Sequence, residues 1–563
     1  MVRQATGEKV LTATAVLTVG LCLLLLLFIP LAALFVSAWP TGNEISSMIP
    51  SCAGSGTASD TACLQHPQIY LKKASQATLV SLLIAVAASV LASAFGTITA
   101  VSTWYLPRQF TAICDALNLL ILALPTFAIG ASLDLSLGRS SLFSPLLGYH
   151  RFAGITATVV IFVLAYSPIA YFSGRLALMR ISKRAAWQSR TLGLYGWRLA
   201  RRTVLPAITA SIALPYGIIF LLTISDPLVP SLFTDHQLTA ATYVWLLVSA
   251  LGDFRLASFL GLFLLVIASL AVSSLWLIQH HLTRHFPAIA NLQRRPARPE
   301  DELWIPGRIS RVALTVNLLN IAINLWALLP VVTAFFTTRW PIISVDVVVN
   351  TLVFALVAVI LSLTVYASAA WLLTRSRLSA KVTTFFLTSL LIVPGATSGT
   401  GLALAYGSPR TVNSLPSWLA STSAVGEGAF LIIASFLTTA IPILFWTLNA
   451  LGARWPRLSI EMAMVLGASR FRALRTVLLP ASAHILAVAL TVTAATSTVM
   501  VAPLIWVTSA QTPVAITHVF TLLDHAQYEQ ALASCLVLAL TTVSLVALTR
   551  LAIALVSQPA GGQ

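Results

Sequence analysis

The segment Glu461–Pro480 reads EMAMVLGASRFRALRTVLLP and lies between two long apolar runs. A weaker copy, Trp187–Pro206, reads WQSRTLGLYGWRLARRTVLP. In both segments a Leu-Gly pair is followed by an aromatic residue, two arginines and a final Leu-Pro, and the spacing between these residues is the same in each. A constant offset over several positions indicates an internal duplication. The sequence therefore predicts a chain built from two related halves.

The second copy has the residues of a helical elbow. Ser459 is placed to cap a short helix that begins at about Ile460, and Gly467 can adopt the left-handed conformation that ends it. A second short helix from about Arg470 carries the arginines, and Pro480 stands where the next membrane helix can begin. Such an elbow suits either docking by another protein or anchoring to lipid headgroups. One copy in each half favours docking.

The composition indicates an integral membrane protein. The 563 residues are 58% hydrophobic and only 9% charged, whereas about a quarter of an average soluble domain is charged. The apolar residues form repeated runs long enough to cross a bilayer as helices. The net charge of +17 is carried by alternate loops, as the positive-inside rule predicts, so it favours topology and contact with anionic lipid over nucleic-acid binding.

The apolar runs predict twelve spans in an all-α fold, six in each half. The first six cover about residues 10–38, 76–103, 113–136, 154–174, 207–225 and 257–279. The second six cover about residues 313–336, 348–373, 381–406, 428–448, 483–506 and 531–557. The first run is much longer than the apolar region of a signal peptide, so we expect it to remain as a span.

The distribution of charge predicts the orientation. With the N-terminus inside, the inner segments hold 26 of the 33 Lys and Arg residues, so both termini and both elbows are expected to be cytoplasmic. Residues 1–279 would form the first half, 280–312 a cytoplasmic linker and 313–563 the second half. Because both halves start inside, the repeat is parallel, and its pseudo-twofold axis should run along the membrane normal.

The second elbow resembles the EAA loop of the permease subunits of binding-protein-dependent ABC importers. The match rests on Glu461, Ala463, Gly467, Ala468 and the Leu479-Pro480 pair, whereas Met462 departs from the pattern. In the first copy Trp187 replaces the glutamate, and only the Gly-aromatic-Arg-Leu-Pro part is kept. The resemblance covers nearly the whole chain, and its best subfamily match is the fused permeases for ferric iron and thiamine.

This resemblance implies a type I ABC importer permease of a bacterial inner membrane. The coupling loops, at about 182–206 and 456–480, would dock onto two copies of a cytoplasmic ABC ATPase. An extracytoplasmic binding protein would deliver thiamine, ferric iron or a similar small solute. The residues that the resemblance assigns to ATPase coupling are Glu461, Ala463, Gly467, Ala468, Arg472, Arg475 and Pro480 in the second loop, and Gly193, Arg198, Arg201 and Pro206 in the first.

The chain is not expected to be an enzyme or to bind a cofactor itself. It has no Gly-rich loop ending in Gly-Lys, so ATP would act through the partner subunits. No metal site is expected either, because the cluster His280, His281 and His285 has no acidic or cysteine partner at matching spacing and suits the cytoplasmic end of a helix.

The third span of each half contains a proline–glycine break, at LPTFAIG with Pro125 and at VPGATSGTG with Pro394. Broken backbone at membrane depth either lines a cavity or is buried in protein, and the glycines suit close helix packing equally well. The two interpretations are left open. The candidate residues for the translocation path are Pro125, Asp226, Pro394, Gly399, Thr496, Ser497 and Met500.

Asp226 and the hydroxyl residues of the fifth spans each allow two interpretations. Asp226 is either a functional residue at the exit of a cavity or a helix-end residue in water, and Met500 stands at its position in the second half. Thr493, Thr496 and Ser497 either line the path or bond back to their own helix. Asn317, Asn320 and Asn324 recur at helical spacing and are expected to join helices.

Cys52 and Cys63 share the loop after the first span. That loop is predicted to be extracytoplasmic, which favours a disulfide over two free thiols.

A stand-alone 6+6 secondary transporter driven by an ion gradient is the alternative function. Such proteins depend on ionisable residues inside the membrane, and this sequence has few of them. A bound ATPase that copurifies with the chain would discriminate between the two functions.

Overall fold

A computed structural model gives the fold of the chain. It describes residues 2–39, 60–103, 106–137, 152–178, 191, 193, 205–234, 237–285, 307–338, 343–407, 429–451, 462–468, 472, 486, 489–491, 493–496, 499, 503–506, 512–525 and 527–557. Throughout these ranges the regular structure is helical, and they contain no strand.

Seven helical segments in the described ranges are long and apolar enough to cross a membrane. They are formed by α1 (Val2–Leu23) with η1 (Leu24–Phe28) and α2 (Ile29–Ala38), α3 (Asp60–Thr103), α7 (Ile155–Leu178), α13 (Phe254–His285), α14 (Gly307–Thr337), α15 (Val345–Arg375) and α23 (Tyr528–Ser557). The expectation of an α-helical membrane protein is therefore supported, with up to nine spans if two bent helix pairs are included.

The two bent pairs are the predicted third spans. The first consists of α4 (Arg108–Leu122) and α5 (Thr126–Leu137), which meet at 101°, and the second of α16 (Arg377–Ile392) and α17 (Gly395–Tyr406), which meet at 94°. The breaks predicted at Pro125 and Pro394 are confirmed, since a proline cannot donate the hydrogen bond that would continue the helix. Each predicted third span is thus two helices at a steep angle rather than one straight helix.

Three other predicted spans are shorter or largely undescribed. The apolar parts of α10 (Leu205–Ser225) and α18 (Ala429–Leu451) cover Pro215–Ser225 and Ala429–Phe445, and most of 483–506 lies outside the described residues. The total of twelve spans therefore stays a prediction.

The two halves of the sequence interlock through their first spans. α1 packs along α15, and α2 packs against α17, whereas α14 packs against α3, α4 and α5. Two hydrogen bonds fasten the first span to the second half: Trp371 Nε1 donates to Thr12 Oγ1 at 3.2 Å, and Tyr406 Oη donates to the carbonyl of Leu25 at 2.8 Å. Each half thus covers part of the other.

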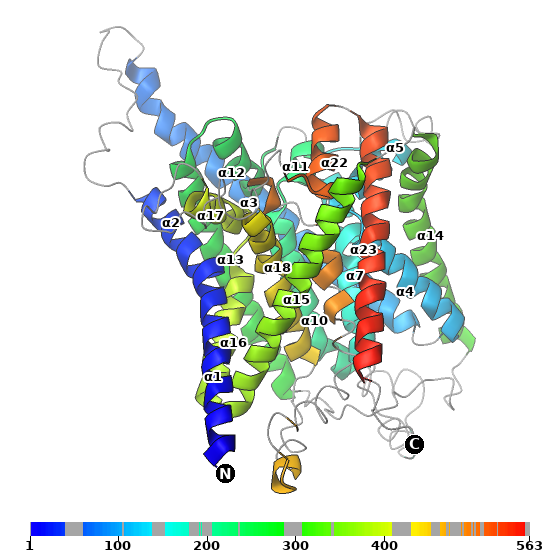
Figure 1. Cartoon of the computed structure of the whole chain (residues 1–563). Helices are drawn as coiled ribbons and strands as arrows, with labels where there is room; N and C mark the ends of the chain where they lie inside the picture. The colour runs from blue at the N-terminus through cyan, green and yellow to red at the C-terminus, as the bar shows by residue number, and fades with distance from the viewer. Residues whose placement is uncertain are drawn as a thin grey trace.

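Figure 1 shows which segments share an end of the bundle. The N-terminal end of α1, the C-terminal end of α23 and the short helical segment 462–468 lie at one end, at the bottom of the view. The short helices α11 (Leu228–Phe233), α12 (Ala240–Ser249) and α22 (Ala515–Asp524) lie at the opposite end. The second elbow therefore lies at the same end as the two terminal helix ends.

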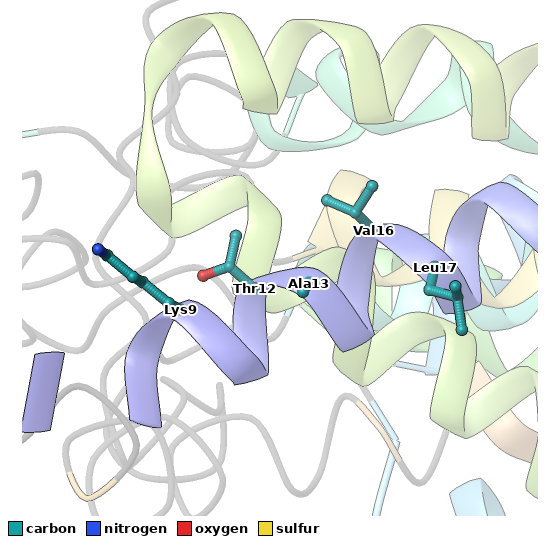
Figure 2. A pocket seen from close by; sticks show the side chains of 5 residues that line it. All are labelled: Lys9, Thr12, Ala13, Val16 and Leu17. Carbon is teal, nitrogen blue, oxygen red and sulfur yellow. The ribbon is translucent and has the colours of Figure 1, made fainter. Parts of the chain in front are cut away.

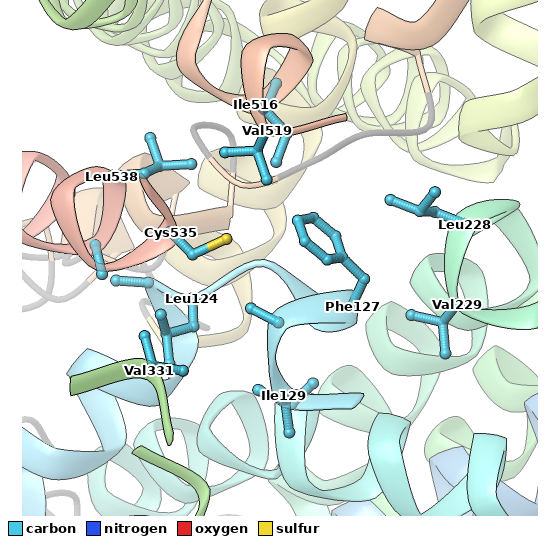
Figure 3. Packing of buried hydrophobic residues seen from close by; sticks show 14 of the residues in the cluster. Leu124, Phe127, Ile129, Leu228, Val229, Val331, Ile516, Val519, Cys535 and Leu538 are labelled. Atoms are coloured by element: carbon cyan, nitrogen blue, oxygen red, sulfur yellow. The ribbon is translucent and has the colours of Figure 1, made fainter. Parts of the chain in front are cut away.

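One apolar cluster joins the two halves behind the first break. Phe127 of α5 is 1% exposed and lies among Leu228 and Val229 of α11, Val519 of α22 and Cys535 of α23 (Figure 3). Because protein interiors pack densely, α5 is fixed by contacts from both halves.

Candidate functional site

The second elbow contains a helical turn that ends at a left-handed glycine. Gly467 has φ +89°, its amide donates to the carbonyl of Met464 at 2.9 Å, and the amide of Ala468 donates to the carbonyl of Ala463 at 3.0 Å. This pair of hydrogen bonds is the Schellman motif, which satisfies the last carbonyls of a helix and requires a positive φ at the glycine. The conformation predicted for Gly467 is confirmed.

The first elbow has a glycine of the same kind. Gly193 has φ +72°, and a Cβ added at either Gly193 or Gly467 would meet no atom within 4 Å. Neither glycine is therefore required by close packing, and backbone conformation alone accounts for both. The predicted residues Glu461, Arg475 and Pro480, with Arg198 and Arg201, lie outside the described residues, as does Ser459, and Pro206 is described only as part of the α10 backbone.

The turn before Gly467 presents apolar side chains to the outside. Met462 is 60% exposed, Val465 87% and Leu466 86%. A lone exposed apolar residue is ordinary, but three in five residues on a projecting turn form a small knob that no described residue of this chain covers. We name Met462, Val465 and Leu466 the apolar knob. Its chemistry suits insertion into a groove of another protein.

At the first break, Asp226 holds two helix starts together. The residue is 7% exposed and follows α10. Its Oδ2 accepts a hydrogen bond from the hydroxyl of Thr126 at 2.8 Å, and its Oδ1 accepts from the amides of Leu228 at 2.9 Å and Val229 at 3.2 Å. The interpretation of Asp226 as a helix-end residue in water is wrong, because the carboxylate is buried and bonds to the first turns of α5 and α11. Its role in a path is untested.

An ion pair holds the other end of the first broken span. Arg175 Nη2 lies 3.2 Å from Asp115 Oδ2, and Tyr171 Oη donates to Asp115 Oδ1 at 2.6 Å, which joins α7 to α4. At the offset that relates the two elbows, Tyr171 and Arg175 correspond to Phe445 and Asn449. The second half therefore lacks the residues of this pair.

Each broken span carries a glycine covered by an aromatic ring of its own half. A Cβ on Gly130 of α5 would lie closer than 3.0 Å to the ring of Phe233, and one on Gly399 of α17 closer than 3.0 Å to the ring of Trp506. The spacing from Pro125 to Gly130 is the same as that from Pro394 to Gly399, so the two glycines are equivalent. The breaks are expected either to line a cavity or to allow close packing of helices. Both glycines are closely packed.

The other path candidates have local partners. Thr493 Oγ1 donates to the carbonyl of Ala489 at 2.8 Å, and Thr496 Oγ1 donates to that of Thr493 at 3.2 Å, so both bond back to their own helix. Ser497 and Met500 lie outside the described residues, as do Cys52 and the side chain of Cys63. The predicted disulfide therefore stays a prediction.

Of the three asparagines of α14, Asn317 makes a hydrogen bond to the first half. Asn317 Oδ1 accepts from Cys114 Sγ of α4 at 3.6 Å, and Asn324 Nδ2 donates to Asn320 Oδ1 at 3.4 Å. Asn317 thus joins two helices as expected, whereas Asn320 and Asn324 bond to each other within one helix.

Sequence analysis missed a second repeat, at the end of the bundle opposite the elbow. α12 reads AATYVWLLVS and α22 reads AITHVFTLLD, so Ala, Thr, Val and Leu recur at the same positions. The amide of Ala240 donates to Ser81 Oγ of α3 at 2.8 Å, and the amide of Ala515 donates to Thr351 Oγ1 of α15 at 2.8 Å. The same hydrogen bond therefore fixes the start of both short helices.

The two short helices also touch through equivalent residues. The rings of Trp245 and Phe520, each the sixth residue of its helix, lie 6.1 Å apart and are edge to face. Equivalent residues of two related halves meet only close to the axis that relates them. The contact between these two rings is what the predicted pseudo-twofold axis would produce if it passed between the two helices.

An open groove lies away from these features. It has a volume of about 470 Å³ and is lined by Lys9, Thr12, Ala13, Val16 and Leu17, all on α1 (Figure 2). Val16 and Leu17 are exposed, as expected for a face in contact with lipid. As for metals, the described residues bring together no three His, Cys, Asp or Glu side chains that could hold an ion.

Comparisons with known proteins add no identity: no family model matches the chain, and neither does any curated protein or solved structure.

Proposed function

We propose that the chain is the membrane permease of an ATP-driven importer of the ABC class. In this proposal it is a polytopic protein of a bacterial inner membrane with twelve spans, and it forms the path of a small solute such as thiamine or ferric iron. The solute is delivered by an extracytoplasmic binding protein. Two cytoplasmic ATPase subunits, one for each elbow, supply the energy, and the chain itself hydrolyses no ATP.

The observation that carries the proposal is the apolar knob on the second elbow. A helical turn that projects from the bundle, ends at a left-handed Gly467 and exposes Val465 and Leu466 is a poor structure for a monomer and a good one for a docking site. Gly193, the equivalent residue of the first elbow, repeats the left-handed conformation. Two such turns, one on each elbow, suit a partner protein that binds as two copies.

In this mechanism the elbows transmit the movement of the ATPase subunits to the membrane helices. Closure of the ATPase pair on ATP moves the two elbows, and the interlocked first spans oblige the halves to move as large bodies. ATP and the loaded binding protein each shift an inward–outward equilibrium through their different affinities for its two states.

The test is copurification of an ATPase from native membranes. We expect an ATPase of the ABC class to be bound to the tagged wild-type chain, and we expect Val465→Asp/Leu466→Asp to lower the bound amount at least tenfold while the chain stays in the membrane. The matched control is Val345→Asp, since Val345 is 76% exposed at the start of α15, away from the elbow. A wild-type chain that binds no ATPase, or a double variant that binds it fully, contradicts the proposal.

A second series isolates the backbone of the elbow. Gly467 has open space around the position of a Cβ, so a substitution there changes only the cost of a positive φ. Asparagine tolerates this conformation better than alanine does. We expect ATPase binding to decrease in the order glycine, Gly467→Asn, Gly467→Ala, and equal binding of the three would count against a docked turn.

The alternative, a stand-alone secondary transporter, would use Asp226 as its ion-coupling residue. The carboxylate is buried, as such a residue should be, but its two oxygens already accept three hydrogen bonds from Thr126, Leu228 and Val229. These contacts suit a structural link better than an exchangeable ion site.

A further inference from the structure

We propose that the second broken span is hinged at Val393–Pro394 and that α17 moves as part of the first half, whereas the first broken span, α4–α5, is fixed.

The two breaks have different backbones. At the first break the chain continues as a hydrogen-bonded turn: the amide of Ala123 donates to the carbonyl of Leu119 at 3.0 Å, and the amide of Leu124 donates to that of Ile121 at 3.1 Å. At the second break Val393 (φ −70°, ψ 115°) and Pro394 (φ −60°, ψ 145°) are both extended. Extended residues between two helices can absorb a rotation without breaking a helical hydrogen bond, which is the usual property of a hinge.

Side chains of the first half brace its own broken span on both sides of the break. The Asp115–Arg175 ion pair ties α4 to α7, and the buried Asp226 ties the start of α5 to α11. Farther along α5, Asp134 Oδ1 accepts from the amide of Phe152 at 3.2 Å. The position of Thr126 is taken in the second span by Gly395, which has no side chain to make the equivalent bond.

The hydrogen bonds of α17 lead instead to the first half. The amide of Gly395 donates to Ser225 Oγ of α10 at 3.0 Å, and Thr397 Oγ1 donates to the carbonyl of Gly261 of α13 at 3.0 Å. At its other end Tyr406 donates to Leu25 of η1. Three bonds spread along twelve residues hold the whole helix against elements that precede residue 286.

α17 also contacts its own half, through an apolar surface. This contact includes Gly399 against the ring of Trp506 and the backbone of Pro503. The indole Nε1 of Trp506 is buried and has no hydrogen-bond partner among the described residues. An apolar contact over a glycine, with no directional bond from the ring, can shift without the loss of a specific partner.

The inference deepens the proposed function and rests on it for the role of the movement in transport. The structural statement can be tested without an ATPase or a substrate. Hydrogen–deuterium exchange of the purified chain in lipid nanodiscs measures local opening directly. We expect the peptide covering residues 390–398 to exchange at least tenfold faster than the peptide covering 121–129. Equal exchange, or faster exchange at the first break, overturns the proposal whether or not an ATPase binds.

Two pairs of variants test the braces. Thr126→Val removes the hydroxyl bonded to Asp226 and Thr126→Ser keeps one, so only the valine variant should raise exchange in residues 121–137, by at least fivefold. Thr397→Val and Thr397→Ser make the same comparison for α17, where only valine should raise exchange in 395–406. If Thr397→Val leaves exchange in α17 unchanged, α17 is not held by the first half and the proposal fails.

Discussion

α12 and α22 resemble each other in sequence and in the contacts at their starts, but several of their side chains differ. In both, the first amide bonds to a hydroxyl of its own half's second span, and the sixth residue is an aromatic ring that meets its counterpart. At the fourth position, however, α12 has Tyr243 and α22 has His518. The two helices therefore share the hydrogen bond at their first amide and the aromatic ring at their sixth position, and they vary at several other positions.

A larger difference lies next to these helices. The first half links α5 to α11 through the buried Asp226, whereas the second half has Gly395 and Met500 at the positions of Thr126 and Asp226. Burial of a carboxylate destabilises the folded protein unless both of its oxygens accept hydrogen bonds. Such a link therefore requires all of its hydrogen-bond donors. The comparison indicates that the first broken span is held by a buried carboxylate, and that the residues at the equivalent positions of the second half cannot make the same link.

Removal of Asp226 should give the largest effect. Asp226→Leu leaves the hydroxyl of Thr126 and two buried amides without their acceptor, and we expect a loss of about 3 kcal/mol in the free energy of unfolding. Thermal unfolding in detergent measures it. Asp226→Asn keeps one acceptor oxygen, so its free energy of unfolding should decrease clearly less than that of Asp226→Leu. If both variants unfold like the wild type, the brace contributes nothing.

The matched hydrogen bonds at the starts of the short helices should give equal effects. Ser81→Ala and Thr351→Val each leave a buried amide, that of Ala240 or Ala515, without an acceptor, which costs about 1–3 kcal/mol. Thr351→Ser keeps the hydroxyl and serves as the control. A large effect in one half and none in the other would show that the two helices are not equivalent after all.

The ring pair should couple the halves more weakly. In a double-mutant cycle of Trp245→Ala and Phe520→Ala, we expect a coupling free energy of about 1 kcal/mol, as for other edge-to-face aromatic pairs. The cycle removes the general effect of truncating each ring. If the free-energy changes of the two single variants simply add in the double variant, the two rings do not interact in solution.

The sequence predicted those features that depend on local backbone chemistry. Pro125 and Pro394 mark the breaks because proline lacks an amide, and Gly467 marks a helix end because glycine tolerates a positive φ. The helical class followed from the apolar runs alone. Each of these is a property of a few consecutive residues.

What the sequence did not predict depends on partners far along the chain. One oxygen of the buried Asp226 carboxylate accepts from the hydroxyl of Thr126, which lies 100 residues earlier in the chain. The first span of each half packs on helices of the other half, α1 on α15 and α14 on α4. No pattern of neighbouring residues in the sequence indicates this packing. The repeat of α12 in α22 was visible as A-x-T-x-V-aromatic, but a pattern of this length gains weight only when the two helices are seen to touch.

The smallest effect should come from His518, which stands in α22 at the position of Tyr243 in α12. Partial burial in α22, which is outside the membrane-crossing helices, lowers the pKa of His518 below its ordinary value of 6.5. The unfolded chain therefore takes up the proton first as the pH falls, so this residue destabilises the fold below pH 6.5 and has no effect above it. His518→Tyr restores the residue of the first half and removes the titration. We expect the unfolding temperature of the wild type to fall more than that of the variant between pH 7.5 and about pH 5. Parallel curves for the two proteins would mean that the neutral imidazole is not favoured in the folded state, and Tyr243 and His518 would then be interchangeable.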